Sequence, residues 1–350
     1  TGCSPRDSFG ASACGMENKM RKKWIRGGIF LCLVLLLLSN LNRILCVKSP
    51  HGVDQTRYLY VQPKNKIDVL FLGSSHVHCN VNTQLLWDEY GMAAYLMTGA
   101  EQPLWNSYYN LKEALKTQKP KLVVLDMFCP SRFYDDFQPG WADENLDGMR
   151  ISLNKLEAVY TSVQEEQSHF FLGFTEYHSR YDQLTTEDFQ NFVWNRKTQE
   201  RWKGYTPLNR HAELTEPDMS HVTTSQEMTE KSKEYFEKIV ELTKKEGIAL
   251  ALISGPYLLE ERDQEVYNSI GQLSEKDGLL FWNTNTPAHY REMGLDFSTD
   301  YADHAHLNEA GGAKYTAYLG KWLSQNYSFP DRRGQKGYES WENQLMKSGE

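Results

Sequence analysis

Five short apolar runs alternate with amphipathic stretches from residue 65 onward, and this alternation restricts the fold more than any other feature of the chain. The apolar runs cover residues 67–72, 93–97, 122–125, 248–253 and 279–282. The amphipathic stretches cover residues 82–90, 104–117, 225–246, 259–276 and 309–325. Short, continuously apolar runs are typical of buried parallel strands. The sequence therefore predicts an α/β fold, with a parallel sheet covered by helices on both faces and ligands bound at the carboxyl ends of the strands.

Residues 130–224 interrupt this alternation. They are rich in aromatic and polar residues, with helix-like pieces near residues 152–167 and 186–195. We expect this segment to form an inserted helical cap between the third and fourth strands. The cap would belong to a domain over residues 65–326, followed by a C-terminal tail over residues 327–350.

A basic segment followed by an uncharged apolar run stands near the N-terminus. The cations of the basic segment are Lys19, Arg21, Lys22, Lys23 and Arg26. Residues 27–38 follow without a charge. This order matches the positive-inside pattern, which predicts a cytoplasmic leader over residues 1–23, one transmembrane segment over residues 24–47 and an extracytoplasmic remainder. We expect Met16 to be the native start, so that residues 1–15 come from a start site placed too far upstream.

Three interpretations of the apolar run are open. Its uninterrupted part is shorter than the ~20 residues of a typical span, and extending it to Val47 includes Asn40, Asn42 and Arg43. A cleavage site of small residues does not follow, which favours an uncleaved anchor over a cleaved signal. A buried helix of a soluble protein is the least favoured interpretation.

The composition disfavours several functions. Lys and Arg number 38 against 46 Asp and Glu, and the formal net charge is −8. Such a chain lacks the basic face that nonspecific nucleic-acid binding requires. The 6 cysteines are too few for a disulfide scaffold and form no Cys-x-x-Cys pair. We therefore expect no nucleic-acid partner, no metal and no cofactor.

Two polar motifs at opposite ends of the predicted sheet carry candidate chemistry. The first strand runs into Gly-Ser-Ser-His at residues 73–76, and a serine between a strand and a helix is exposed where backbone N–H groups converge. Asp303 and His306 precede the last predicted helix with a spacing that lets the carboxylate orient the imidazole. Together they predict Ser75 as nucleophile, His306 as base and Asp303 as its orienter. A common turn at residues 73–76 and a helix cap at Asp303 are the alternatives.

The segments FLGSSH and DHAHLN resemble the signature blocks of the SGNH/GDSL hydrolase superfamily. The resemblance covers residues 65–128 and 225–326, implies a flavodoxin-like three-layer fold, and assigns the same three roles to Ser75, Asp303 and His306. The Gly-Ser-Ser form looks closer to the branch that contains the D-alanyl transfer protein of teichoic acid synthesis and the alginate-type O-acetyltransferases. Those proteins are membrane-tethered, act outside the cytoplasm and often work beside a membrane-bound O-acyltransferase.

The same resemblance suggests how an oxyanion would be bound. It assigns oxyanion-binding N–H groups to Ser75 and Gly99. The family's third block, Gly-x-Asn-Asp, is replaced here by Asp-Met-Phe-Cys at residues 126–129, so its asparagine is absent. Gln102 and Asn106 are candidate substitutes. This departure disfavours a general esterase and favours a dedicated transferase.

Other polar residues are weaker candidates for substrate binding. We expect His76 and His78 to line the pocket or cap a helix rather than to bind a metal, because no third ligand is near. His178 and Arg180 in the insertion could contact a phosphate or sugars of a polymer, or could be structural. The aromatic residues Trp141, Trp194, Trp202 and Tyr205 suit carbohydrate stacking and packing equally.

The combined prediction is a membrane-anchored extracytoplasmic serine acyl-esterase or O-acyltransferase. Its substrate would be a cell-envelope polysaccharide or a teichoic-acid-like polymer, and a membrane-bound O-acyltransferase is a candidate partner. The alternative is a catalytically inactive protein of the same fold that binds envelope glycan or scaffolds an acyltransferase complex.

Two cysteines, Cys79 and Cys129, follow the first and third strands. These strands are neighbours in flavodoxin-like order, so a disulfide is one expectation. Two buried free thiols are the other, slightly favoured expectation.

Overall fold

The computed structural model describes residues 7–45, 51–133, 135–137, 139–165, 167–171, 178–190 and 202–342. The chain divides into two compact units. The first comprises Thr1–Val47 with Leu172–Trp194, and the second comprises Lys48–Phe171 with Asn195–Glu350.

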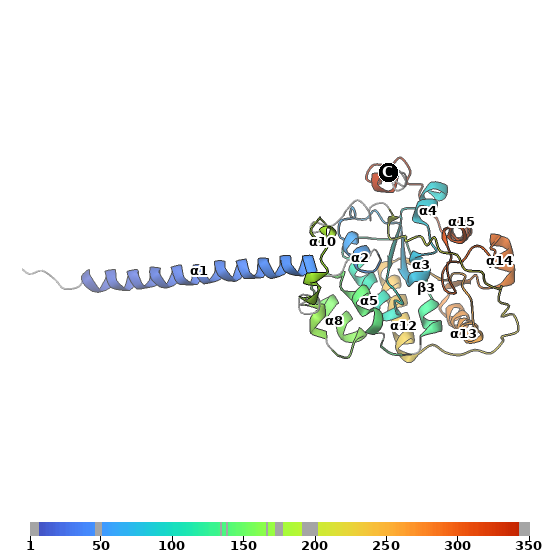
Figure 1. Ribbon diagram of the computed structural model, residues 1–350, viewed down its shortest axis with the longest axis horizontal. Helices are drawn as coiled ribbons and strands as arrows, with labels where there is room; N and C mark the ends of the chain where they lie inside the picture. Colours follow the sequence, from blue (N-terminus) through green and yellow to red (C-terminus); the bar gives the residue numbers. More distant parts are fainter. Residues whose placement is uncertain are drawn as a thin grey trace, which may run out of the picture. The chain divides into compact units, whose positions relative to one another are not determined.

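The first unit is dominated by one long helix, α1 (Asp7–Leu45), drawn in blue in Figure 1. Its Lys19–Asn42 part is long and apolar enough to cross a membrane, and the apolar stretch within it is not buried against other residues that the structure describes. The unit also contains η3 (His178–Asp182) and α10 (Thr186–Gln190). The predicted N-terminal apolar helix is thus confirmed, and by length and composition it suits either an anchor or a signal sequence.

A parallel sheet organises the second unit. Its strands are β1 (Val69–Gly73), β2 (Ala94–Thr98), β3 (Leu122–Asp126), β4 (Ala249–Ser254) and β5 (Leu280–Asn283). Every pairing is parallel, and the order is β2-β1-β3-β4-β5. This is the flavodoxin-like order, so the predicted α/β class and strand positions are confirmed.

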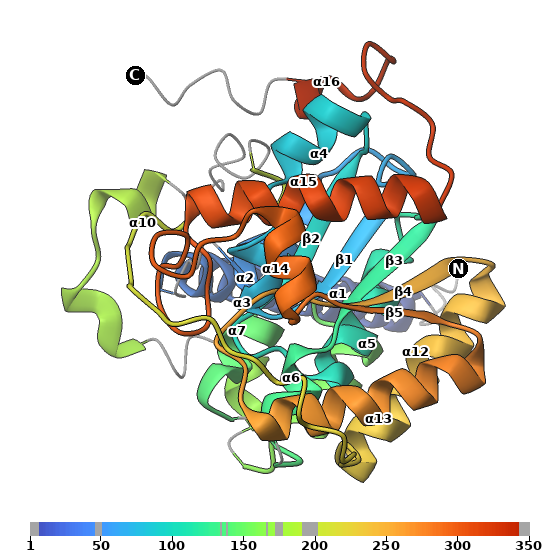
Figure 2. The ribbon, with the colours of Figure 1, turned by 90° about the vertical axis from the view of Figure 1, so that its right-hand side faces the viewer.

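Helices cover both faces of this sheet, as Figure 2 shows. One face carries α5 (Leu104–Ala114), α12 (Glu230–Glu246) and α13 (Glu261–Asp277). The other carries α4 (Thr83–Tyr90), α14 (Pro287–Met293) and α15 (Glu309–Asn326). Successive strand residues enter the two hydrophobic clusters alternately, because side chains alternate across a strand. All five predicted sheet-covering helices are present in these two layers, as α4, α5, α12, α13 and α15.

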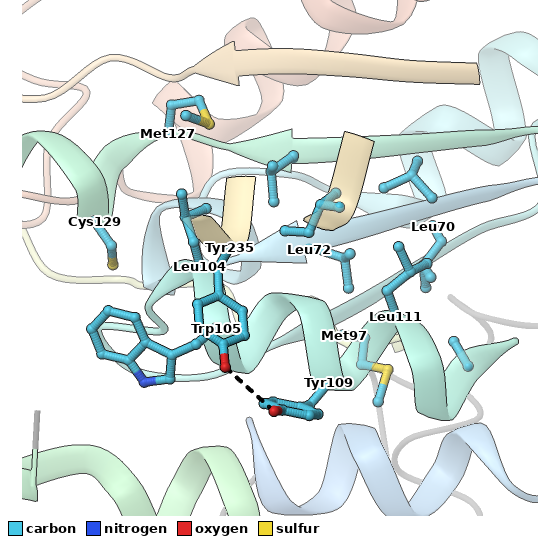
Figure 3. Close-up of a cluster of buried hydrophobic side chains, with 14 of the residues drawn as sticks. Leu70, Leu72, Met97, Leu104, Trp105, Tyr109, Leu111, Met127, Cys129 and Tyr235 are labelled. Carbon is cyan, nitrogen blue, oxygen red and sulfur yellow. Dashed lines mark hydrogen bonds between the residues drawn. The ribbon is translucent and has the colours of Figure 1, made fainter. Parts of the chain in front are cut away.

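The hydrophobic cluster between the sheet and α5 contains both aliphatic and aromatic side chains. Figure 3 shows Leu70 and Leu72 of β1 above Trp105 and Tyr109 of α5. The Tyr109 hydroxyl lies 3.4 Å from that of Tyr235 on α12, which links the two helices through a polar contact inside an apolar layer. This layer fixes the positions of the β1 and β3 ends where the candidate site lies.

The predicted insertion does not form one cap. Its first part contains α6 (Phe128–Arg132), η1 (Pro139–Trp141), α7 (Ala142–Leu146), α8 (Leu153–Ser162) and η2 (Gln167–Phe170), all within the second unit. The part with η3 and α10 belongs to the first unit. The predicted helix near 152–167 ends at Ser162, and the one near 186–195 is described only to Gln190.

The second unit extends beyond the predicted bounds of 65–326. Before β1, α2 (Val53–Leu59) is largely buried. After α15, Arg332 pairs with Asp68 at 2.7 and 2.9 Å, and α16 (Glu339–Glu342) buries Trp341 completely. Residues 327–342 therefore pack on the sheet domain.

Candidate active site

A sharp turn at the end of β1 positions the predicted nucleophile. Gly73 has φ of 152°, and a Cβ there would lie 2.4 Å from the Cβ of Asp126. Only glycine fits so close an approach at positive φ. Ser74 then caps α3 (Ser75–His78) by accepting the His76 N–H. Ser74 and His76 are buried, whereas Ser75 is partly exposed.

Ser75, His306 and Asp303 lie within hydrogen-bond distance of one another in series. The Nε2 of His306 is 2.8 Å from the Ser75 Oγ, and its Nδ1 is 2.8 Å from the Asp303 Oδ1. Because a carboxylate only accepts, Nδ1 carries the proton and Nε2 is left to accept from Ser75. The structure thus brings together residues that are more than two hundred positions apart in the chain. Their catalytic roles stay a prediction.

The loop before α15 holds the acid and the imidazole rigidly. Asp303 Oδ1 also accepts the N–H groups of Ala305 and His306, each at 3.0 Å. Asn80 accepts the N–H of Leu307 at 3.0 Å. Burial raises the pKa of Asp303, but His306, the Ala305 N–H and Arg210 outweigh it, so the pKa lies below its usual value. Asp303 is therefore ionised near neutral pH.

Arg210 is a member of the site that sequence reasoning missed. Its guanidinium lies 3.0 Å from the second oxygen of Asp303, Oδ2. Arg210 stands in the last part of the predicted insertion, before α12, and this part lies alongside the Asp303 loop through the Ala212–Tyr301 bridge. No motif in the sequence marks a lone arginine that lies 93 residues from its partner.

Asp126 at the end of β3 is a second missed member. Its Oδ2 accepts from the Ser74 hydroxyl at 2.8 Å and from the Ser74 N–H at 3.3 Å, and its Oδ1 accepts from the Phe128 N–H at 3.3 Å. Burial raises the pKa of Asp126 to about 6, against these three hydrogen bonds, which lower it. Asp126 stands where the SGNH/GDSL proteins that the sequence resembles have the start of their Gly-x-Asn-Asp block. Here it holds the residue next to Ser75.

His76 lies beside the triad but outside its hydrogen bonds. Its ring stacks on Phe128 at 3.5 Å, meets Tyr257 edge-on at 4.9 Å and lies 5.6 Å from the His306 ring. Within the described part of the chain, neither ring nitrogen of His76 has a hydrogen-bond partner. Burial, aided by His306 and Arg132, lowers its pKa well below the usual value, so the ring is neutral. His76 therefore lies beside the triad as a neutral ring held by its contacts with Phe128 and Tyr257.

His78 makes a hydrogen bond to β2. Its Nδ1 lies 3.1 Å from the Thr98 Oγ1, and its ring stacks on His51 at 4.5 Å. Thr98 in turn donates its N–H and its hydroxyl to the Gln55 side chain of α2. Among the residues that the structure describes, no group of His, Cys, Asp or Glu could hold a metal ion.

The predicted oxyanion donors differ in their availability. The N–H of Ser75 has no acceptor among the described residues, whereas that of Gly99 donates to the Gly73 carbonyl at 3.3 Å. The space beside Gly99 is filled by the Asn145 carboxamide, whose Oδ1 lies 2.3 Å from where a Cβ would stand. Ser75 thus offers the free donor, and the Gly99 assignment stays a prediction.

The two suggested substitutes for the missing asparagine are engaged elsewhere. Gln102 donates to the Ser107 hydroxyl at 3.0 Å and accepts from Asn110 at 2.8 Å. The Asn106 carboxamide oxygen accepts from Ser162 of α8. These hydrogen bonds fasten α5 to its surroundings, and the assignment of Gln102 and Asn106 to substrate or oxyanion binding stays a prediction.

The insertion residues proposed for substrate binding are not gathered at Ser75 by any described contact. Arg180 belongs to the first unit, where it pairs with Asp188 at 3.3 Å and donates to the Leu45 carbonyl. The side chain of His178 and the whole of Trp194 lie outside the described residues. Trp202 packs edge-on against Tyr205 with ring centres 6.0 Å apart.

Cys79 and Cys129 are both free and buried. Burial raises the pKa of Cys79 to about 12 and also raises that of Cys129 above its usual range. The strands that precede them are neighbours, as predicted, but a disulfide is not formed. Both thiols are therefore protonated and unreactive near neutral pH.

Comparison with known proteins gives structural likenesses, one of which is described here. No protein-family model matches the chain, and no curated protein matches it. A solved structure of a candidate acylhydrolase from Bacteroides fragilis is similar, with a TM-score of 0.37 and 13% sequence identity. The match covers 78% of this chain and 94% of that one. A likeness at this level supports no inference about the reaction.

Proposed function

We propose that this protein is a membrane-anchored serine acyl-esterase or O-acyltransferase of the SGNH type. The observation that carries the proposal is the series of two 2.8 Å hydrogen bonds that links Ser75, His306 and Asp303. A nucleophile, a base and an orienting carboxylate in this order are the defining arrangement of serine acyl-transfer sites. The partial exposure of Ser75, between two buried neighbours, also supports a role in contacting substrate.

The reaction follows from these positions. Ser75 Oγ attacks the acyl carbonyl while His306 Nε2 takes its proton, and the same proton passes to the departing hydroxyl as the acyl-enzyme forms. Water or an acceptor hydroxyl then attacks the acyl-enzyme, with His306 again acting as base. Asp303 stabilises the imidazolium in both steps. The Ser75 N–H binds the developing oxyanion, and Gly99 can join it by exchanging its bond to Gly73.

The substrate and location are proposed from the N-terminus and the resemblance. The basic segment before an apolar helix that could cross a membrane favours a domain outside the cytoplasm. A polymer of the cell envelope, either a polysaccharide or a teichoic-acid-like polymer, would present the hydroxyl or its ester to Ser75. A membrane-bound O-acyltransferase is the proposed source of acyl groups.

Turnover of p-nitrophenyl acetate tests the proposal. We expect Ser75→Ala and His306→Ala to lower the rate by at least about 10³-fold with unchanged melting, because each removes a member of the triad. His304→Ala is the matched control and should keep the activity, since its side chain lies outside the series. Equal activity of Ser75→Ala and the wild type would overturn the assignment.

A second function is a catalytically inactive member of this fold that binds envelope glycan or scaffolds an acyltransferase complex. It is favoured by the incomplete oxyanion site, where Gly99 donates to Gly73 and Gln102 to Ser107. Loss of one oxyanion donor costs roughly 10²–10³ in rate. This alternative predicts no ester turnover by the folded wild-type protein.

A further inference from the structure

Apolar side chains of α8, together with Ile151 just before its N-cap Ser152, face solvent. These side chains, here called the α8 face, are Ile151, exposed by 74%, Leu153 by 77%, Leu156 by 41% and Tyr160 by 59%. Leu153, Leu156 and Tyr160 are spaced so that they share one side of the helix. A surface helix of a soluble domain normally presents polar residues there. The α8 face is therefore an unusual surface that needs an occupant.

The opposite side of α8 is buried and firmly attached, so the α8 face cannot turn inward. Ala158 and Val159 are buried in the main cluster. Asn154 donates to the Tyr109 carbonyl at 3.0 Å and to the Glu113 carboxylate at 2.9 Å, both on α5. These contacts fix the orientation of the helix and hold the exposed apolar side chains in place.

The α8 face adjoins the point where the chain enters the sheet domain. Residues 46–52 join the end of α1 to the start of α2. Tyr60, directly after α2, donates to Glu113 at 2.6 Å and accepts the Arg150 N–H at 3.0 Å. Glu113 is the same carboxylate that holds Asn154 of α8. In the sequence, residues 46–52 are therefore all that stands between the helix that could cross a membrane and the start of the domain that carries the α8 face.

The chemistry of the α8 face fits a lipid surface. Separate leucine and isoleucine side chains on a convex helix can enter the acyl region one by one, and Tyr160 suits the headgroup level. Glu157, the acid on the exposed side, is paired with Lys112 at 2.7 Å. The Arg150 guanidinium lies 4.1 Å from the centre of the Tyr60 ring. A net charge of −8 gives no general attraction to anionic lipids, so contact must come from apolar insertion.

We propose that the α8 face inserts into the surface of the bilayer that α1 crosses. This inference rests on the membrane anchoring in the proposed function and adds a second contact to it. Two contacts would hold the sheet domain, and with it Ser75, at a set orientation to the membrane. A single attachment through α1 would not fix that orientation.

Lipid quenching of site-specific fluorophores tests the inference in the full-length protein. The protein is reconstituted into vesicles of phosphatidylethanolamine and phosphatidylglycerol that carry nitroxide-labelled lipid. An environment-sensitive fluorophore is attached in turn to Leu153→Cys on the α8 face, Leu33→Cys in α1 and Leu280→Cys on β5. Leu280 is the matched control, because it is an apolar side chain exposed by 46% on an edge strand. In the parent protein used for labelling, serine replaces four cysteines, Cys3, Cys14, Cys32 and Cys46.

We expect the nitroxide lipid to quench the fluorophores at positions 33 and 153 by about twofold or more and to leave position 280 unchanged. Quenching at 33 without quenching at 153 would leave the anchor intact and overturn the α8 contact. A blue shift at 153 without lipid quenching would also overturn it, because a protein surface would then cover the helix. No quenching at 33 would contradict the anchor itself and the inference with it.

Discussion

The two oxygens of the Asp303 carboxylate have different partners. Oδ1 accepts from the His306 ring and from two backbone N–H groups, and Oδ2 pairs with Arg210. The first set orients the base, and the second keeps the carboxylate from rotating away from it. Arg210 is mostly exposed, so its electrostatic contribution is screened by water and its role is mainly geometric.

Asp126 is the residue at which the pH dependence of stability is most informative. Its pKa rises from the usual 3.8 to about 6 in the folded protein, so the folded state holds the proton more tightly than the unfolded state does. The contribution of Asp126 to stability is therefore present below pH 4 and is lost as the pH rises to 6. A shift of this size corresponds to about 3 kcal/mol.

We expect Asp126→Asn to abolish this dependence, because asparagine does not titrate. Chemical unfolding of the wild type and the variant between pH 4 and pH 7 measures it. The free energy of unfolding of the wild type should fall relative to that of Asp126→Asn across this range. A constant difference between the two proteins would show that Asp126 is not buried as described.

Sequence reasoning found the side chains with a local signature and missed those without one. Ser75 follows a strand, and Asp303 precedes His306 by one turn, so both motifs are visible in short windows. Arg210 and Asp126 act through contacts with residues far along the chain, and neither stands in a recognisable pattern. For Gln102, a carboxamide near a strand end does not indicate which hydrogen-bond partners its atoms will have, and here they are Ser107 and Asn110.

Among the elements, the turn from β1 to α3 depends on a glycine. Gly73 combines positive φ with contact against Asp126, whereas Gly271 lies within α13 (Glu261–Asp277) with nothing within 4 Å of the point where a Cβ would stand. The same substitution should therefore have opposite effects at the two glycines.

Gly73→Ala should destabilise the protein by about 2–4 kcal/mol, because the methyl group clashes and the backbone is strained. Gly271→Ala should stabilise it by about 0.5–1 kcal/mol, because alanine is the better helix former. Urea midpoints of the two variants and the wild type check both signs. A neutral Gly73→Ala would mean that the turn can open without cost.

The elements themselves were largely predictable, and their ends were less so. The 225–246 stretch begins its helix at Glu230 because Thr229 caps it, accepting the Ser232 N–H. The 104–117 stretch ends at Ala114. Apolar periodicity identifies which face of a helix is buried, but a cap decides where the helix starts.

At the scale of the whole molecule, the parallel sheet followed from the alternation of apolar runs and amphipathic stretches, and its strand order from the family resemblance. The domain limits did not. Gln55 of α2 bonds Thr98 and Gly204, and the Trp341 indole donates to the Ala94 carbonyl at 3.0 Å. Such contacts join segments that are far apart in the sequence, and no local sequence pattern predicts them.

The separation of the insertion into two units was also beyond sequence reasoning. Residues 130–224 look uniform in composition, but α8 and its neighbours pack in the sheet domain, whereas η3 and α10 are grouped with α1. The sequence pattern marks where the α/β alternation stops. It does not specify which of two hydrophobic surfaces a short helix will join.

The central claim is that Ser75 is an activated nucleophile. Its most direct test is treatment of the full-length protein with a fluorophosphonate, followed by mass-spectrometric mapping of the covalent adduct. We predict one adduct, on the peptide that contains Ser75. We predict none in a His306→Ala variant that is folded like the wild type. A folded wild-type protein that stays unlabelled, or is labelled at another residue, would contradict the account.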